Sequence, residues 1–318
     1  MKLPTFLKVI KLRPLTNLIK VDQNVRFYTK TTDDHLDTVN MSFTTYEGSM
    51  TSSSSTESPP LIVMHGLFGA KRNWNSLCKV FHQKMIPQRK IIAVDARNHG
   101  ESPHSNTHSY PHLAEDVRQL CTQLDIKKAS LLGHSMGGRA LMYFALKYPH
   151  MVEKLIVADV SPINTSRSLN SMYSIFNAIQ KVDLPSNESM SSARINCDKQ
   201  LSKSISDKGL RAFLLTNLAQ DSNGSFIWKV NVQALMENFS EHIADFPDVS
   251  GYNFNGSVLF VAGETSDYIQ KSDHSQILKI FPKAEFQEIK GAGHWVHSDK
   301  PNEFLKICLE FLNRASSN

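Results

Sequence analysis

The sequence predicts an α/β fold: a mostly parallel sheet with helices on both faces and a helical cap insertion. Three observations support this prediction. Short apolar runs without polar alternation are typical of strands that are buried on both faces. Longer segments between them repeat apolar residues at helical spacing, and regular alternation of the two implies a parallel sheet. One long stretch, residues 161–255, breaks this rhythm.

The individual elements follow from these patterns. Five aliphatic runs are expected as strands: Leu61–Met64, Ile91–Val94, Ala129–Leu132, Leu155–Ala158 and Val258–Ala262. Helical spacing predicts four helices: Trp74–Met85, Leu113–Leu124, Met136–Lys147 and Asn302–Asn313. Met41–Tyr46 is a shorter β-like stretch, and a serine-rich loop at residues 50–60 follows it. Residues 161–255 look mostly helical with no convincing strand, so we expect a cap inserted between two strands.

The positive charge is concentrated at the N-terminus. The formal net charge is +5, from 35 Lys and Arg against 30 Asp and Glu. Residues 1–32 contain seven basic residues and one acid, Asp22, so the other 286 residues have 28 basic and 29 acidic groups. A nearly neutral body gives no reason to expect a surface that binds nucleic acid.

Residues 1–32 are predicted to be a mitochondrial presequence, followed by a hydrolase domain at residues 33–318. Apolar and basic residues are interleaved in this leader, acids are nearly absent, and there is no continuous apolar core of the secretory kind. Arg26-Phe27-Tyr28-Thr29 resembles a matrix-processing site. We expect a mitochondrial, matrix location; the alternatives are a basic surface helix or a disordered tail.

Metal sites, disulfides and membrane spans are not expected. The four cysteines are far apart and form no Cys-x-x-Cys pair: Cys78, Cys121, Cys197 and Cys308. This spacing fits a reducing compartment. Three loop histidines without acid or cysteine partners at ligand spacing are interpreted as solvated: His104, His108 and His112. No uncharged apolar run approaches the ~18 residues of a membrane helix.

A Gly-x-Ser-x-Gly motif stands where a predicted strand meets a predicted helix. Gly133-His134-Ser135-Met136-Gly137 follows the end of the strand Ala129–Leu132 and opens Met136–Lys147. In this setting the motif forms a strained turn that exposes the serine hydroxyl, and glycines are needed because side chains would clash. A plain glycine-rich turn is the alternative, but the context favours Ser135 as a nucleophile.

The loop after the first predicted apolar strand is expected to complete an oxyanion hole. His65-Gly66-Leu67-Phe68-Gly69 follows Leu61–Met64. Such an early loop supplies one backbone N–H, and the residue after the nucleophile supplies the other. We therefore expect the amides of Leu67 and Met136 to be the donors, with His65 bracing the loop. The alternative is an ordinary strand-to-helix turn.

A serine hydroxyl needs a neighbouring base to become nucleophilic. The chain has 13 histidines, and His294 lies in Gly291-Ala292-Gly293-His294-Trp295 just before the last predicted helix. The chain order Ser, Asp, His requires the base in this region. His297, three residues later, is expected on the flank.

Two aspartates are candidates for the acid that orients His294. Asp159 ends the strand Leu155–Ala158, and Asp267 follows Val258–Ala262. Both are expected at carboxyl ends of neighbouring strands, where either could accept a hydrogen bond from the imidazole. Either could instead be a helix N-cap. Spacing alone leaves both open.

Six segments together resemble one known group of proteins. They are His65–Gly69, Asp95–Ser105, Gly133–Gly138, Asp159–Pro162, Phe213–Leu218 and Gly291–Trp295. Over about residues 40 to 314, the chain resembles the mitochondrial abhydrolase domain-containing protein 11 group of the α/β-hydrolase superfamily. Fungal ethanol acetyltransferases and small bacterial esterases are related to this group. The segment in the cap points to its animal branch.

The resemblance implies an α/β-hydrolase with Ser135 as nucleophile and His294 as base. It favours Asp159 over Asp267, because relatives place the acid after the sixth strand. Some family assignments place an acid within the insertion, but the position that matches holds Gln233. The resemblance also implies acylglycerol (diacylglycerol) lipase or esterase activity, without a cofactor, and association with a mitochondrial 2-oxo-acid dehydrogenase complex.

We therefore expect an acyl-enzyme on Ser135 that water releases. Six apolar residues of the insertion are expected either to line an acyl pocket or to form the core of the cap: Met172, Ile175, Phe176, Ile179, Leu214 and Leu215. Acyl-CoA thioesterase and alcohol acyltransferase activities remain chemical alternatives, because they share the same intermediate. The more distant alternative is a matrix interaction protein with little turnover.

Overall fold

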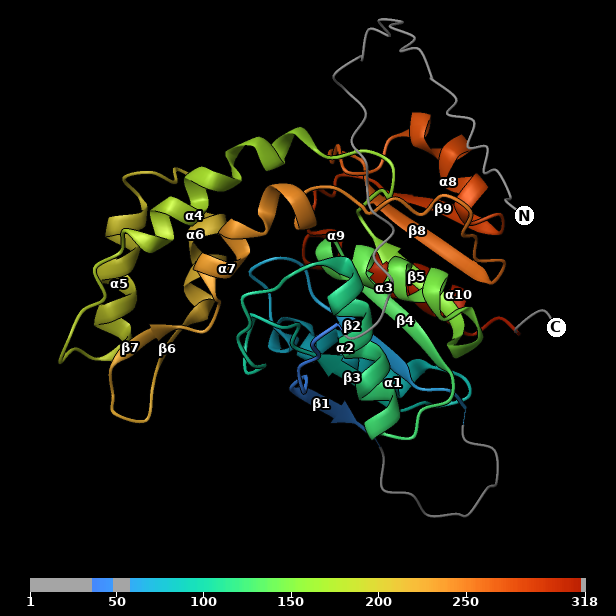
Figure 1. The fold of residues 1–318 in the computed structure, drawn as a ribbon, viewed down its shortest axis with the longest axis horizontal. Coiled ribbons are helices and arrows are strands. Elements are labelled where there is room, and N and C mark those ends of the chain that lie inside the picture. The colour runs from blue at the N-terminus through green and yellow to red at the C-terminus, as the bar shows by residue number, and fades with distance from the viewer. Residues whose placement is uncertain (1–35, 48–57, 316–318) are drawn as a thin grey trace, which may run out of the picture. The chain divides into compact units, whose positions relative to one another are not determined.

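Seven strands form one sheet in the order β1-β3-β2-β4-β5-β8-β9 in the computed structural model, which describes residues 36–47 and 58–315 (Figure 1). The strands are β1 (Phe43–Tyr46), β2 (Leu61–Met64), β3 (Ile91–Val94), β4 (Ala129–His134), β5 (Val152–Ala158), β8 (Ser257–Gly263) and β9 (Ala284–Ile289). Only β1 runs antiparallel to its neighbour within this sheet. The predicted mostly parallel sheet is confirmed. The predicted presequence and most of the serine-rich loop lie outside the described residues.

Every residue of β2 and β3 is inaccessible to solvent, which explains why these strands show no polar alternation. One face of the sheet is covered by α2 (Tyr110–Gln123), α3 (Met136–Lys147) and α8 (His274–Ile280). The other face is covered by α1 (Asn75–Lys84) and α10 (Pro301–Leu312), with the short α9 (Val296–Asp299) beside them. The four predicted helices are therefore present.

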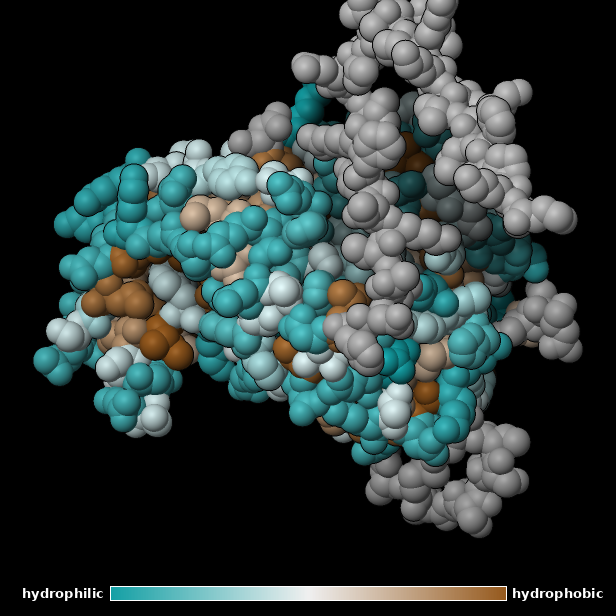
Figure 2. All heavy atoms as spheres, viewed as in Figure 1, coloured by the Kyte–Doolittle hydropathy of each residue, from teal (hydrophilic) through white to brown (hydrophobic). Residues whose placement is uncertain are grey.

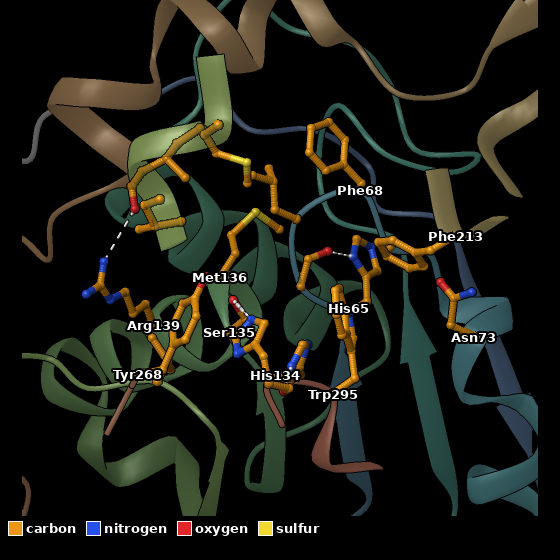
Figure 3. A pocket seen from close by; sticks show the side chains of 18 of the residues that line it. His65, Phe68, Asn73, His134, Ser135, Met136, Arg139, Phe213, Tyr268 and Trp295 are labelled. Atoms are coloured by element: carbon orange, nitrogen blue, oxygen red, sulfur yellow. Dashed lines mark hydrogen bonds between the residues drawn. The ribbon is translucent and has the colours of Figure 1, made fainter. Parts of the chain in front are cut away.

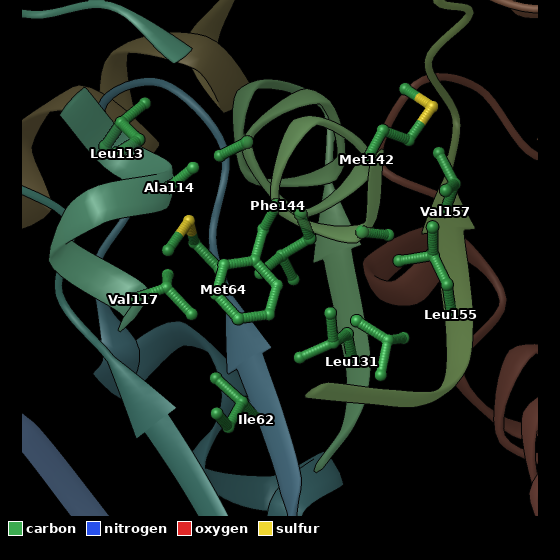
Figure 4. Packing of buried hydrophobic residues seen from close by; sticks show 14 of the residues in the cluster. Ile62, Met64, Leu113, Ala114, Val117, Leu131, Met142, Phe144, Leu155 and Val157 are labelled. Carbon is green, nitrogen blue, oxygen red and sulfur yellow. The ribbon is translucent and has the colours of Figure 1, made fainter. Parts of the chain in front are cut away.

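The core on the α2–α3 face is built from side chains of both layers (Figure 4). Phe144 of α3 packs in one cluster with Val117 of α2 and Leu131 of β4, and all three are fully buried. Burial of each such side chain stabilises the fold by roughly 1.5–3 kcal/mol. This packing holds α3, and thus the turn that precedes it, against the sheet.

The cap lies between β5 and β8 and extends to one side of the sheet (Figure 1). Its helices are α4 (Met172–Gln180), α5 (Met190–Leu201), α6 (Lys208–Leu214) and α7 (Val232–Glu237). They enclose a separate hydrophobic core that contains Phe176, Leu214 and Leu235. Short 3₁₀ or π turns occur at Lys71–Trp74, Pro149–Met151, Arg167–Ser171, Leu215–Asn217, Phe239–Ile243 and Lys271–Asp273.

The prediction that the cap contains no strand is wrong. β6 (Leu218–Gln220) and β7 (Phe226–Trp228) form an antiparallel hairpin. Each strand has only three residues, too few for a visible periodicity. The turn between them contains Asn223 and Gly224, and Gly224 has φ +80°. An Asn-Gly pair is a known hairpin signal that could have revealed it.

The surface seen in Figure 2 is mainly hydrophilic, with hydrophobic side chains gathered at the end of the cap that carries α5, β6 and β7. Ile195 of α5 is 71% exposed and Ile227 of β7 is 38% exposed. Among the described residues, no helix combines the length and apolarity needed to cross a bilayer.

Candidate active site

Ser135 sits on the turn between β4 and α3 with a strained backbone. Its φ of 52° and ψ of −120° lie in a region that L-amino acids rarely adopt. A Cβ added at Gly133 would lie 2.4 Å from the carbonyl oxygen of Gly137, and one at Gly137 would lie 2.5 Å from that of His65. The requirement for glycine at both positions is thereby confirmed.

The structure brings Ser135, His294 and Asp159 together in one hydrogen-bonded chain. Ser135 Oγ lies 3.1 Å from His294 Nε2, and His294 Nδ1 lies 2.8 Å from Asp159 Oδ2. With Nδ1–H donating to the carboxylate, Nε2 is left to accept the serine proton. The three residues follow β4, β5 and β9, and parallel strands place their carboxyl ends at one edge of the sheet.

Asp159 is completely buried, and its carboxylate is held by two further donors. The amide of Gly263 donates to Oδ1 at 3.0 Å, and the hydroxyl of Ser266 donates to Oδ2. Asp159 itself has φ 51°. Since a buried charge needs such partners, β8 and the loop after it fix the carboxylate toward the imidazole.

The structure does not bring Asp267 to His294. Asp267 instead accepts hydrogen bonds from the hydroxyl of Ser166 and, at 3.1 Å, from the amide of Arg167. It thus ties the first residues of the cap to the loop after β8. Gln233 is exposed on α7 and bonds to Gln180 and Glu237, so it too contributes nothing to the site.

Other rings surround the imidazole of His294. Tyr268 stacks on it with ring centroids 3.7 Å apart, and His134 donates from Nε2 to the His294 carbonyl at 2.9 Å. His297 stacks on Trp74 at 4.3 Å, on the flank as predicted. Burial lowers the pKa of His134 well below its ordinary value and that of His297 to about 3, so both are neutral.

The loop at residues 65–69 lies against the Ser135 turn. A Cβ at Gly66 would be only 3.1 Å from that of Ser135. His65 braces the loop as expected: its Nδ1 donates to the Gly66 carbonyl at 2.8 Å, and its Nε2 accepts from the amide of Ala96 at 3.1 Å. Burial lowers the pKa of His65, which keeps this tautomer neutral.

The two residues whose amides are expected as oxyanion donors line the same cavity. Leu67 and Met136 both line it together with Ser135. In the part of the chain that the structure describes, neither amide donates to another protein group. Both are thus available to an oxygen atom placed beside Ser135, which is the requirement for an oxyanion hole.

Two of the three loop histidines were interpreted wrongly. His108 is 1% exposed, not solvated; its Nε2 lies 3.3 Å from Met136 Sδ and its Nδ1 lies 3.3 Å from Asn98 Nδ2. His112 lies in the helix α2 and is not solvated either, because its Nε2 lies 3.2 Å from Asp37 Oδ1 and its Nδ1 contacts the Ser109 hydroxyl. His104 is exposed and contacts the Lys229 carbonyl. Among the described residues, no group of three or more His, Cys, Asp or Glu could hold a metal ion, and the four cysteines are free and buried.

The cavity above Ser135 has a volume of about 240 Å³ (Figure 3). Two of the six residues predicted for an acyl pocket, Met172 and Ile175, line it, and so does Phe213, which was not predicted. The other four residues predicted for an acyl pocket belong to the core of the cap: Phe176, Ile179, Leu214 and Leu215. Figure 3 shows Phe68 and Phe213 across the cavity from Arg139 and Tyr268.

Arg139 was missed by the sequence analysis. It is 3% exposed and donates to the carbonyls of Ser161 at 3.1 Å and Asn164 at 3.0 Å, where the cap begins, and to that of Ala244, near where it ends. The sequence carries no signal for this role. Ser266 and Tyr268 were missed as well, although their position after β8, beside a candidate acid, could have indicated them.

These features define a class of protein: the serine hydrolases with an α/β architecture. In this class a strained Ser turn stands on a mostly parallel sheet, and a histidine and a buried aspartate are hydrogen-bonded to the serine in sequence. The family model for the alpha/beta hydrolase fold matches residues 59–301. The chain belongs to the α/β-hydrolase family and, within it, to the abhydrolase domain-containing protein 11 group, and it is an ester hydrolase.

Three similar proteins support this assignment. The mouse (Mus musculus) protein named sn-1-specific diacylglycerol lipase ABHD11 is 41% identical over 254 residues, covering 80% of this chain and 81% of that protein. The Danio rerio protein of the same name is 39% identical over 274 residues, covering 86% and 83%. A solved structure described as a marine microorganism esterase superposes with a TM-score of 0.76 at 33% identity, covering 86% of this chain and all of that one.

Proposed function

We propose that the protein hydrolyses diacylglycerol or a closely related acylglycerol through an acyl-enzyme on Ser135. The observation that carries the proposal is the hydrogen-bonded chain from Ser135 through His294 to the buried Asp159, at the floor of a cavity lined by apolar cap residues. The names of the mouse and fish relatives support the substrate class.

In the first half of the reaction, Ser135 Oγ attacks the ester carbonyl while His294 Nε2 takes the hydroxyl proton. Asp159 accepts the Nδ1–H bond and stabilises the imidazolium that forms. The carbonyl oxygen becomes negative and accepts hydrogen bonds from the amides of Leu67 and Met136. The C–O bond of the ester then breaks, and the alcohol leaves with the proton from His294.

In the second half, water takes the place of the alcohol. His294 removes a proton from the water as its oxygen attacks the acyl carbon, and the same two amides hold the second oxyanion. The bond to Ser135 Oγ breaks, the proton returns from His294 to the serine, and the free fatty acid leaves. The cycle needs no group beyond the side chains and amides named above.

The electrostatics of the cavity favour an uncharged ester. Of the residues that line it, Arg139 carries the formal charge at neutral pH, and its guanidinium is bound to backbone carbonyls at both ends of the cap. A phosphate or carboxylate group would have to compete with those carbonyls for the guanidinium. An acylglycerol requires only apolar contact for its chain and a few polar contacts for its glycerol.

The experiment that tests the proposal compares three reactions of the full-length protein. We expect release of fatty acid from diacylglycerol vesicles at a much higher kcat/KM than cleavage of an acyl-CoA or acyl transfer to ethanol. The Ser135→Ala variant should lose all three, because they share one acyl-enzyme. A thioesterase or transferase rate above the lipase rate would contradict the assignment of substrate.

We propose further that residues 1–32 direct the protein to mitochondria. Their excess of basic over acidic residues, seven against one, supports this. A fluorescent protein fused behind these residues should accumulate in the matrix, and cytosolic fluorescence would contradict the proposal. Association with a 2-oxo-acid dehydrogenase complex remains a prediction from the family resemblance.

A further inference from the structure

We propose that Asn217 of the cap is a positioning residue for the oxyanion hole, so that docking of the cap fixes the amide of Leu67. The inference rests on the proposed function, because it takes Leu67 as an oxyanion donor. It assigns a physical role to the Phe213–Leu218 segment, which the catalytic chemistry described above does not use.

Phe68, the residue after Leu67, has a strained backbone that is held from both sides. Its φ is 61°, a region that is unfavourable for a bulky side chain and persists only where the surroundings enforce it. Its N–H donates to His99 Nε2 at 3.1 Å, and its carbonyl accepts from Asn217 Nδ2 at 2.8 Å. These two bonds come from different parts of the fold.

The bond that Phe68 donates to His99 lies outside the cap, in the part of the fold that contains the seven-stranded sheet. His99 is fully buried, and its Nδ1 donates to the carbonyl of Arg97 at 2.9 Å, which leaves Nε2 as an acceptor. Burial lowers the pKa of His99 to about 3, so the acceptor persists at neutral pH. The acceptor for the Phe68 N–H is therefore present independently of the cap.

The bond from Asn217 belongs to the cap. Asn217 follows α6, is 1% exposed, and also donates from Nδ2 to the Leu214 carbonyl at 3.2 Å. The ring of Phe68 contacts Phe176 of α4 with centroids 5.4 Å apart and is part of the hydrophobic core of the cap. Phe68 thus has its backbone at the active site and its side chain in the cap.

The side-chain oxygen of Asn217 lacks a hydrogen-bond partner in the described part of the chain, which indicates that the residue does more than stabilise the fold. Asn217 Oδ1 is buried and has no partner among the described residues. An unsatisfied buried carbonyl is destabilising, which offsets what the amide gains through Nδ2. The residue is therefore best explained by what its Nδ2 does, which is to hold the carbonyl of Phe68.

If the Asn217 bond is lost, the strained conformation of Phe68 can relax, and the peptide of Leu67 rotates away from the cavity. Ser135, His294 and Asp159 have no contact with this bond and stay aligned. The expected result is a defect confined to the transition state, where the oxyanion exists, with little effect on ground-state binding.

The test uses two inhibitors with the same alkyl chain: a trifluoromethyl ketone, which adds to a serine to form a tetrahedral oxyanion, and the corresponding methyl ketone. In Asn217→Leu, we expect the inhibition constant of the trifluoromethyl ketone to rise about 10- to 100-fold, because a displaced donor should cost less than the roughly 10²- to 10³-fold effect of removing one. The constant for the methyl ketone should stay within about twofold, and kcat should fall with KM unchanged.

Asn238 provides a matched control. Its Nδ2 also donates to one carbonyl outside the cap, that of Asn106 at 2.8 Å, and to one carbonyl of its own helix, that of Ala234 at 2.8 Å. Asn238→Ala removes an equivalent bond between cap and core without touching Phe68. It should leave both inhibition constants and kcat unchanged.

Three outcomes overturn the inference. The first is an unchanged ratio of the two inhibition constants in Asn217→Leu. The second is an equal change in Asn238→Ala, which would show a general loosening of the cap. If Asn217→Leu does not fold, Asn217→Ala, which is smaller and carries no donor to Phe68, takes its place with the same criterion. The third is a wild-type protein that the trifluoromethyl ketone does not inhibit, which overturns the proposed function itself.

Discussion

Asp159 and Asp267 are alike in the sequence, but the structure gives them different partners. Each follows a buried strand, so the pattern could not separate them. Asp159 follows β5, adjacent to the strand that leads to Ser135, and its carboxylate meets His294. Asp267 lies four residues beyond β8 and bonds to the start of the cap. The separation depends on long-range packing, which residue spacing does not contain.

Replacement of Asp159 by asparagine is expected to lower kcat by about 10³- to 10⁴-fold, because the imidazole loses its orienting carboxylate and favours the wrong tautomer. Asp267→Asn should retain kcat within about threefold, since Asp267 has no contact with His294. Steady-state hydrolysis of a soluble ester by both purified variants measures this. A large loss in Asp267→Asn with activity retained in Asp159→Asn would reverse the assignment.

The buried histidines make the stability of the fold depend on pH. Burial lowers the pKa of His99 to about 3, whereas an unfolded histidine titrates near 6.5. Below about pH 6.5 the unfolded chain binds a proton that the folded chain excludes, so the free energy of unfolding falls with falling pH down to about pH 3. His134 and His297 act in the same direction.

Between pH 7 and pH 5, His99 alone should cost about 2 kcal/mol of unfolding free energy. Urea unfolding at the two pH values measures the loss. In His99→Gln, which does not titrate and keeps an acceptor for the Phe68 amide, the loss should be smaller by that amount. An unchanged pH dependence in this variant would show that His99 is not the titrating group.

Among the elements, the turn that carries Ser135 is tightly constrained. A Cβ at Gly137 would lie 2.5 Å from the His65 carbonyl oxygen and 2.6 Å from that of Met64, so backbone would have to move. Gly137→Ala should lower the free energy of unfolding by about 2–3 kcal/mol and abolish esterase activity.

Thermal unfolding of Gly137→Ala beside Gly209→Ala tests this expectation. Gly209 lies in the helix α6, where an added Cβ meets only Asp207 Oδ1 at 3.2 Å. Alanine favours a helix, so Gly209→Ala should be neutral or stabilising by up to about 1 kcal/mol. Equal Tm values for Gly137→Ala and the wild type would refute the steric account of the turn.

Two neighbouring residues of the helix α4 have different roles, one in the cavity and one in the core of the cap. Ile175 lines the cavity, whereas Phe176 is fully buried in the core of the cap. Phe176→Ala should destabilise the protein by about 3–5 kcal/mol. Ile175→Phe should fold normally and reduce kcat/KM for long-chain esters by about tenfold relative to acetyl esters, because it fills the cavity.

Hydrolysis of a series of 4-nitrophenyl esters of increasing chain length, with Tm measured on the same samples, tests this pair. The same chain-length profile in Ile175→Phe and the wild type would mean that the acyl group lies elsewhere. The sequence grouped both residues as one apolar set because helical spacing shows an apolar stripe but not its division between cavity and core.

How far the sequence predicts an element depends on how long and how regular that element is. Met136–Lys147 was predicted with the bounds of α3, since a 12-residue apolar helix beginning at a Ser turn leaves little choice. The hairpin β6–β7 was missed because its strands have three residues each. His108 was taken as solvated because local composition does not reveal its contacts with Met136, Asn98 and His99.

At the scale of the whole molecule, the parallel sheet explains why distant residues form one site. Ser135, Asp159 and His294 are separated by up to 159 residues, yet each follows the carboxyl end of a strand in the same sheet. The fold class and the Ser135 turn could be predicted because both leave local patterns. The cavity could not, because it forms between the sheet and an insertion with its own core.

The distribution of charge over the chain is also understood at the scale of the whole molecule. Residues 33–318 carry 28 basic and 29 acidic groups, and the cavity is lined mostly by neutral side chains. This balance is consistent with an uncharged ester as substrate and gives no support to nucleic-acid binding. Ser135 at the floor of this cavity remains the central claim.

The most direct test of that claim is reaction of the folded protein with a fluorophosphonate, followed by mass spectrometry of the intact chain and its peptides. The account predicts a single phosphonyl adduct on Ser135 in the wild type and none in Ser135→Ala of equal Tm. A folded wild type that gains no adduct, or a Ser135→Ala variant that is still labelled at the same rate, would contradict it.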